Sequence, residues 1–268
     1  MTSTQKVIKY CAIALAIFLI VSIIGGIVGA LSSLVLLFGD SDVTGEMKSY
    51  PITDGVKRLD IEIGSARLEI RTGETFALEC NHKYISVKQT GDTLTIHEPT
   101  RIGINRSSSA SVILTVPEGT VFDRASIVTG AGAVTVDALS ANRLSLVLGA
   151  GEVRIDFLQA ETRAEISGGA GRMTVKGGTL HDLELDMGVG ELNLTSRLTG
   201  SCDIDQGVGE MNLILLGEKS DYRIDLEKGL GSAILDGMTV SGGIYGNGSS
   251  RLDIDGGIGS ITISYKPQ

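Results

Sequence analysis

Apolar and polar residues alternate along the second half of the chain, and pairs of glycines interrupt the alternation at regular intervals. Between residues 126 and 264 one phrase, apolar-x-apolar-x-x-Gly-apolar-Gly-x-apolar-x-apolar, occurs seven times. The first four steps between copies are 19, 20, 19 and 19 residues, and the last two are 22 and 28. A fixed period of this length is typical of a solenoid, in which each coil buries its apolar face against its neighbours. The residues between the glycines are Ala131, Ala150, Ala170, Val189, Val208, Leu230 and Ile258.

The alternation has a period of two on each side of the glycine pair, which predicts two strands per copy. Its parity slips by one across the glycines, as a bend between strands requires, and glycine tolerates the backbone angles of such a bend. We therefore expect an all-β fold, a parallel β-solenoid with about 19–20 residues per coil. Crossovers between parallel strands are right-handed as a rule, so we expect a right-handed solenoid.

The stretch before the repeats contains a weaker copy of the phrase. When the copies are aligned on the residue between the glycines, equivalent positions form columns of like residues. Residues 59–70 fit the same columns with Ser65 in the central place, and we expect this copy to begin the stack. Three alternating stretches, 76–80, 85–89 and 93–97, follow and resemble strands of a cap, because the end of a stack must be covered. Residues 58–123 are thus interpreted as a cap with the first degenerate coil, and residues 124–268 as the repeats. The long last step adds a loop at residues 237–250.

Residues 10–38 form an apolar run without charge, long enough to cross a bilayer core of about 30 Å as a helix. Lys6 and Lys9 precede it and acidic residues follow. The positive-inside rule places residues 1–9 in the cytoplasm and everything after the helix outside, with residues 39–57 as a polar linker. The run is too long for the apolar core of a cleaved signal peptide, so we expect a single-pass membrane anchor.

Small residues form a stripe along the predicted membrane helix. Gly25, Gly29 and Ser33 recur every fourth residue, and such stripes let two helix backbones approach closely in lipid. One interpretation is a homo-oligomer, or pairing with another membrane protein, through this helix. The alternative is that glycine is simply common in membrane helices.

Charge and composition exclude several classes of function. The chain has 23 basic and 32 acidic residues, and without Lys6 and Lys9 the balance is 21 against 32, or −11, outside the membrane. This balance disfavours nucleic acid as a partner. The glycine pairs lack the third glycine of a dinucleotide fingerprint and the nine-residue period of calcium-binding repeats. Three scattered cysteines suggest no metal site, and Cys202 occupies an apolar column that predicts a buried thiol. We expect no cofactor, no metal and no catalytic residues.

The outward-facing columns are increasingly acidic toward the C-terminus. Equivalent positions on adjacent coils lie about 4.8 Å apart, at which like charges repel. An arginine column beside the acids would form a solvated salt ladder, which is the purely structural interpretation. That column has no arginine in two adjacent copies, which predicts a negative patch that binds a cation or a basic partner. The residues of this predicted patch are Asp182, Glu184, Asp186, Asp203 and Asp205.

Residues 114–120, Leu-Thr-Val-Pro-Glu-Gly-Thr, are followed by Phe122 and then by the Gly-x-Gly repeats. This arrangement resembles the bacterial "putative adhesin" β-strand-repeat domain of unknown function, over residues 52–264. The resemblance implies a right-handed β-helix in the bacterial envelope, often tethered by one N-terminal membrane helix. Some members of the family are associated with envelope-stress systems that respond to cationic antimicrobial peptides. The family has no catalytic residues to carry over.

Together these features predict a membrane-anchored, extracytoplasmic interaction or scaffold protein of the bacterial cell envelope, without enzymatic activity. Its partner would be an envelope protein or polymer. A second hypothesis is a sensor or sequestering protein for cationic antimicrobial peptides, acting through the acidic face. A third is a solenoid enzyme acting on polysaccharide, which would need carboxylates clustered in a groove.

Overall fold

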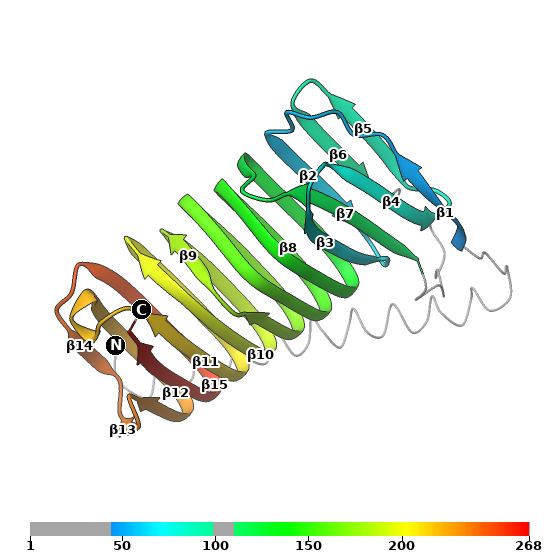
Figure 1. The fold of residues 1–268 in the computed structure, drawn as a ribbon. Helices are drawn as coiled ribbons and strands as arrows, with labels where there is room; N and C mark the ends of the chain where they lie inside the picture. The colour runs from blue at the N-terminus through cyan, green and yellow to red at the C-terminus, as the bar shows by residue number, and fades with distance from the viewer. Residues whose placement is uncertain (1–43, 99–109, 268) are drawn as a thin grey trace, which may run out of the picture.

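The computed structural model describes residues 44–98 and 110–267. Fifteen strands form one continuous sheet that winds into a stack of coils (Figure 1). The predicted all-β parallel solenoid is therefore confirmed. Among the described residues, no helix has both the length and the apolar character needed to cross a membrane. The predicted membrane helix, residues 10–38 with Gly25, Gly29 and Ser33, lies outside the described residues.

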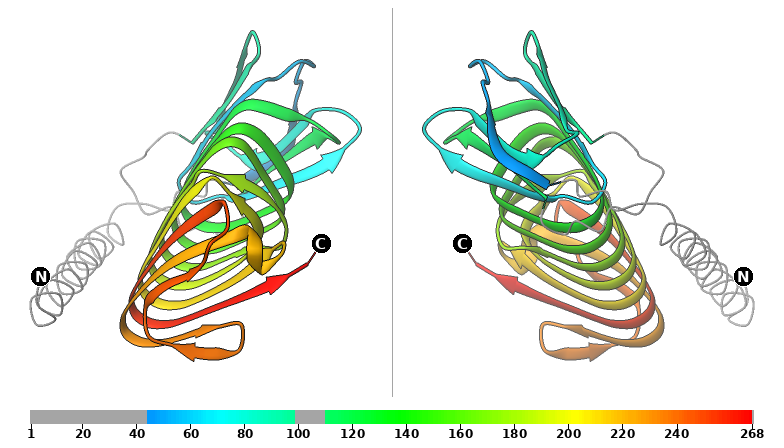
Figure 2. Two further views of the ribbon diagram at one scale, coloured as in Figure 1. Left: turned by 90° about the vertical axis from the view of Figure 1, so that its left-hand side faces the viewer. Right: turned by 90° about the vertical axis from the view of Figure 1, so that its right-hand side faces the viewer.

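Each repeat forms one coil, and neighbouring coils pair in parallel and in register. The long strand β8 (Val121–Val175) contains the first three coils, and β10 (Leu183–Thr199) and β11 (Ser201–Leu216) continue the stack. The short strand β9 (Gly178–His181) joins β8 to β10 on another side of the coils. Viewed obliquely along the stack, the coils have a roughly triangular outline (Figure 2).

The core of the solenoid is made by the apolar columns that the sequence predicts. Along β10 the burial pattern alternates, so that Leu183 and Leu185 are buried while Glu184 and Asp186 are exposed. The register pairs Leu185 with Ile166 on one side and with Ile204 on the other. Stacking like residues on like residues fills the interior mainly with aliphatic side chains, because each coil repeats the shape of its neighbour.

The N-terminal coils do not stack in chain order. The degenerate copy forms β2 (Arg58–Ile63) and β3 (Arg67–Gly73), and these pair with β8 on one side. On the other side they pair in parallel with β6 (Thr93–His97) and β7 (Ser111–Pro117), which come later in the chain. The expectation that residues 59–70 begin the stack is therefore wrong. The β6–β7 coil lies outside them and satisfies backbone groups that an end coil would leave open.

Antiparallel strands close the N-terminal end of the stack. Strand β4 (Ala77–His82) pairs with β7, β5 (Ser86–Thr90) pairs with β6, and β1 (Thr44–Tyr50) pairs with β4. The three stretches predicted as cap strands do form strands, to within two residues at either end, but the third, β6, belongs to the outermost coil. Residues 44–50, expected as part of a polar linker at residues 39–57, instead form β1. This strand covers the outer edge of β4, which would otherwise offer unpaired N–H and C=O groups.

The C-terminal coils are exchanged in the same way. Strand β15 (Ser250–Lys266), the last in the chain, lies between β11 and β12 (Tyr222–Leu235) and pairs in parallel with both. A single 3₁₀ turn, η1 (Lys219–Asp221), precedes β12. The expected loop at residues 237–250 contains β13 (Met238–Val240) and β14 (Gly243–Gly246), both antiparallel to β12. These short strands cap the distal end of the stack.

Candidate functional site

An acidic ladder runs over the last four coils of the stack. Residues on each coil pair with the matching residues of the next coil, so carboxylates that are far apart in the chain become neighbours. Two rows result, and both lie on the outward-facing positions of the strands that lead into the glycine bends. In spatial order the first row is Glu184, Asp203, Asp253 and Asp225, and the second row is Asp186, Asp205, Asp255 and Glu227.

The alternation of the strands positions these side chains. Ile204 and Ile254 are fully buried, so the residues on either side of them must point outward. Parallel coils lie about 4.8 Å apart, and carboxylates at that spacing repel each other by roughly 1 kcal/mol even in water. The ladder is thus held in place by the hydrophobic core against its own repulsion.

An arginine pairs with the first carboxylate of the ladder, Glu184. Arg163 bonds through Nε to Glu165 at 2.6 Å and through Nη2 to Glu184 at 2.7 Å. Glu184, which was expected to lack a cation, is therefore paired across coils. By contrast, in the described part of the chain Arg223 and Arg251 form no ion pair with the ladder carboxylates, although they lie beside these acids in sequence.

Asp182 has a different role from the other residues of the predicted patch. Its backbone has a φ of 46°, in the left-handed region that aspartate tolerates in turns. Its Oδ1 accepts a hydrogen bond of 2.9 Å from the backbone N–H of Ser201, and its Oδ2 lies 3.5 Å from Nε2 of His181. Asp182 thus holds the turn before β10 and is already engaged.

The carboxylates on β11 and β15 show the electrostatic cost of the arrangement. The pKa of Asp255 is raised to about 6. Partial desolvation is the largest cause, and the negative charges of Asp205 and Glu227 add to it. Desolvation and the neighbouring carboxylates also raise the pKa values of Asp205 and Asp253. The Oδ1 atom of Asp255 is buried and has no hydrogen-bond partner. The strongest negative field therefore lies on the coils of β11, β15 and β12.

Sequence reasoning identified Glu184, Asp186, Asp203 and Asp205 but missed the other four members of the ladder. Asp225, Glu227, Asp253 and Asp255 stand in the same columns, and the arginines at positions 223 and 251 made them look compensated. The recurrence of acidic residues in these columns was sufficient to identify all four. The missing information was that the β15 coil lies between the other two, which brings its carboxylates next to Asp203 and Asp205.

Other chemistry-bearing groups do not form a site. Cys80 and Cys202 are free and buried, and burial raises the pKa of the Cys202 thiol to about 11, as suits a core residue. Among the described residues, no cluster of three or more His, Cys, Asp or Glu side chains has a geometry that could hold a metal ion. Two hollows at the glycine bends are lined mainly by glycine and aliphatic residues, without a carboxylate in either lining.

The fold is similar to solved structures of several bacterial proteins. A putative cell adhesion protein from Clostridium sporogenes is 17% identical, covering 82% of this chain and 99% of that one, with a TM-score of 0.36. A putative adhesin from Parabacteroides distasonis is 16% identical, covering 84% and 99%, with a TM-score of 0.44. One from Bacteroides fragilis is 13% identical, covering 84% and 100%, with a TM-score of 0.37.

No curated protein matches the chain. The family model described as Toastrack DUF4097 matches residues 56–237, from the last residues before β2 to the end of the β12 coil. This match confirms the resemblance found in the sequence and covers more than half of the chain, which therefore belongs to the Toastrack DUF4097 family.

Proposed function

We propose that this protein is a non-catalytic interaction module of the bacterial cell envelope, which binds a basic partner through the acidic ladder. In this proposal residues 10–38 anchor the chain in the cell membrane and the solenoid lies outside. One observation carries the proposal. A block of seven carboxylates beyond Glu184 spans the four coils, and within residues 44–98 and 110–267 no arginine or lysine forms an ion pair with any of its aspartates. A patch of one sign attracts a partner of the other sign and accelerates its association.

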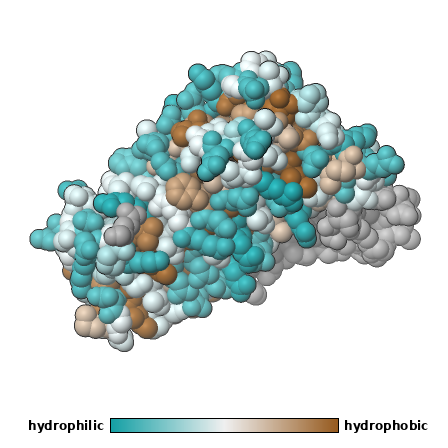
Figure 3. Space-filling model, in the orientation of Figure 1, coloured by the Kyte–Doolittle hydropathy of each residue, from teal (hydrophilic) through white to brown (hydrophobic). Residues whose placement is uncertain are grey.

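The shape of the molecule supports a role as a rigid scaffold. The rows are fixed by parallel pairing from β10 to β12, so the spacing of the charges does not depend on loops. Figure 3 shows one face of the stack, where hydrophilic residues cover much of the middle coils and hydrophobic residues gather nearer the ends. Antiparallel strands close both ends, which leaves the sides of the stack as the surfaces for a partner.

The proposal is tested by titrating the purified full chain with a labelled oligolysine at low and moderate salt. In the test variant Asp203, Asp205, Asp253 and Asp255 are replaced by Asn. Exposed charge pairs contribute about 0.2–1 kcal/mol each, so we expect the loss of four to weaken binding by about tenfold at low salt. Added salt should weaken the binding of the wild-type chain.

A matched control changes the net charge by the same amount elsewhere. Asp137, Glu152, Asp156 and Glu161 are exposed, and each is already bonded to an arginine, a lysine, a glutamine or a backbone N–H group. Replacing these four by their amides should leave the affinity within about twofold. If both variants lose affinity equally, net charge alone explains the binding, and the ladder is only a solvated surface.

A further inference from the structure

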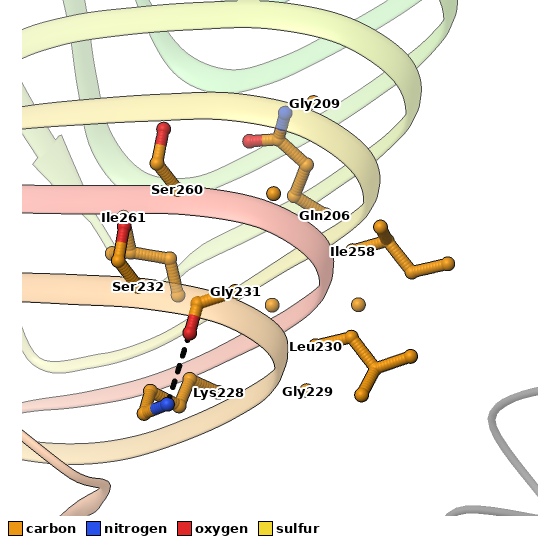
Figure 4. A pocket seen from close by; sticks show the side chains of 13 residues that line it. Gln206, Gly209, Lys228, Gly229, Leu230, Gly231, Ser232, Ile258, Ser260 and Ile261 are labelled. Carbon is orange, nitrogen blue, oxygen red and sulfur yellow. Dashed lines mark hydrogen bonds between the residues drawn. The ribbon is translucent and has the colours of Figure 1, made fainter.

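The residues between the paired glycines form an apolar ridge along one corner of the stack. Its last four members, Val189, Val208, Ile258 and Leu230, are paired coil to coil in that order. Val189 is 36% exposed, Ile258 42% and Leu230 55%, and Val208 is half-buried. In Figure 4 the side chains of Ile258 and Leu230 point away from the coils, on the outer side of the bend.

The fold itself does not require large aliphatic residues at this corner. On the first three coils the same position holds Ala131, Ala150 and Ala170, which are exposed. The side chains enlarge only from Val189 onward, and enlarging an exposed apolar side chain adds nothing to the core. A row of exposed aliphatic residues is a common mark of an interaction surface.

The ridge and the acidic ladder begin on the same coil. Three residues before each ridge residue stands a member of the second carboxylate row: Asp186, Asp205, Asp255 and Glu227. On the three preceding coils that position holds Val128, Val147 and Ser167. The column between the glycines therefore changes from alanine to larger aliphatic residues, and the column three residues earlier changes from valine or serine to acidic residues. Both changes occur at the same coil. Three residues span at most about 10 Å, so one ligand can reach both rows.

A buried polar group without a partner lies beneath the same ridge. Gln206 is 5% exposed, and its Nε2 donates a hydrogen bond of 3.0 Å to the carbonyl oxygen of Gly190. Its Oε1 has no hydrogen-bond partner, and the side chain lines a small hollow together with Ile258 and Leu230 (Figure 4). Lys228 also lines the hollow, and its Nζ lies 3.0 Å from the carbonyl oxygen of Gly231. The carbonyl oxygen of Gln206 is buried, so it marks an unsatisfied polar group under the ridge and not a contact for a ligand on the surface.

We propose that the apolar ridge and the second carboxylate row together bind one basic amphipathic helix of a partner protein, lying along the stack axis across four coils. The aliphatic face of the helix packs on the ridge, and its lysines or arginines face Asp205, Asp255 and Glu227. This inference rests on the proposed function and names the class of its partner.

The spacing of the coils favours a helix over an extended segment. A helix advances 5.4 Å per turn, which is close to the coil spacing of about 4.8 Å, so residues one turn apart meet successive coils. An extended segment advances about 6.6–6.8 Å between side chains on one face, and it would slip out of register within two coils. Four coils span about 14 Å, or roughly three helical turns.

The test uses the purified full chain and three labelled peptides. The first has leucines at helical spacing with lysines beside them, the second is a scramble of the same composition, and the third is oligolysine. The ridge variant carries Val208→Ala, Ile258→Ala and Leu230→Ala, which restores the residue found on the first three coils. The control variant carries Val121→Ala, Val147→Ala and Met238→Ala, which are also exposed but stand outside the ridge.

We expect the amphipathic peptide to bind wild type at least tenfold more tightly than the scramble does, and the ridge variant to lose that advantage. The control variant should bind like wild type, and oligolysine should bind wild type and the ridge variant equally. If oligolysine binds but the ridge variant retains the amphipathic peptide, or the scramble binds as well as the amphipathic peptide, the ridge proposal is overturned and the proposed function stands. If oligolysine and the amphipathic peptide both fail to bind wild type, the proposed function fails with it.

Discussion

Gly259 lies directly against Gly209 on the adjacent coil, although 50 residues of chain separate them. A Cβ atom at Gly259 would collide with the carbonyl oxygen of Gly209, and the same relationship joins Gly231 to Gly259. The glycine bends thus stack backbone on backbone, in the order β11, β15 and β12. This order decides which acidic side chains become neighbours.

Substitution of Gly259 should be severely destabilising. The residue has a φ of 146°, and the collision involves backbone that cannot move without shifting a coil. We expect Gly259→Ala to lower the free energy of unfolding by about 3 kcal/mol or more, measured by urea denaturation. Gly243→Ala is the matched control, because Gly243 has a φ of 135° but no atom within 4 Å of an added Cβ. A loss of about 1 kcal/mol is expected there, and equal losses would refute the steric argument.

The coil order can be read from engineered cross-links. Ser260 pairs with Glu210 on one side and with Ser232 on the other. Adjacent coils bring Cα atoms to about 4.8 Å, which suits a disulfide, and coils two apart to about 10 Å, which does not. Under mild oxidation, Glu210→Cys with Ser260→Cys should therefore cross-link, whereas Glu210→Cys with Ser232→Cys should not. Peptide mapping by mass spectrometry distinguishes them, and the reverse pattern would mean that the coils follow chain order.

Removing the charge of Asp255 should stabilise the protein in a pH-dependent way. Its pKa in the folded chain, about 6, is above the ordinary value of 3.8, so folding opposes its ionisation. The stability associated with the protonated form is complete below about pH 4 and is lost as pH rises through 6. Asp255→Asn should thus raise the free energy of unfolding at pH 7.5 by about 1 kcal/mol, allowing for solvent screening.

The gain from Asp255→Asn should disappear near pH 4, where the wild-type carboxylate is protonated. Thermal denaturation at both pH values is sufficient to measure the difference. Asp123→Asn, at an exposed position near the start of β8, serves as the control and should change little at either pH. A gain that is the same at pH 4 and pH 7.5 would show that charge is not its cause.

Glu98 should have the opposite effect, because its carboxylate stabilises the bend between β2 and β3. It accepts hydrogen bonds of 2.8 Å and 3.0 Å from the N–H groups of Gly64 and Ser65, and one of 3.2 Å from the Ser65 hydroxyl. His82 Nε2 lies 3.3 Å away. Burial alone would raise the pKa of Glu98, but these hydrogen bonds and the nearby His82 hold it below its ordinary value.

We therefore expect Glu98→Gln to lower the free energy of unfolding at pH 7 by about 2 kcal/mol, because hydrogen bonds to a charged acceptor are lost. A lowered pKa means that this contribution is present above the ordinary value of 4.5 and is lost as pH falls through the folded value. Denaturation at pH 7 and pH 3 should show the variant converging on wild type in acid. Glu118→Gln, an exposed control, should have no effect, and a constant deficit across pH would contradict the electrostatic role.

The site was only partly predictable from sequence. Columns of like residues identified Asp186, Asp203 and Asp205, because a period of about 19–20 residues stacks equivalent positions whatever the neighbours are. The aligned sequence columns did not show which side chains contact residues on a neighbouring coil. Arg163 extends to Glu184 on the next coil, whereas among the described residues Arg223 and Arg251 form no ion pair with the aspartates beside them. Asp182 shares the acidic composition of the patch, but its left-handed backbone gives it a local role in a turn.

The sequence by itself determined the kind of coil: alternating strands, glycine bends and an aliphatic interior follow from local periodicity and from the steric freedom of glycine. Only the tertiary structure decided the order of the coils. The copies are so alike that each can pair with any other, and nothing in a single copy specifies its neighbour. The caps and the long connections settle the order, since β13 and β14 cover β12 and leave the place beside β11 to β15. Pairing between segments that are distant in sequence therefore assembled the acidic ladder and the apolar ridge.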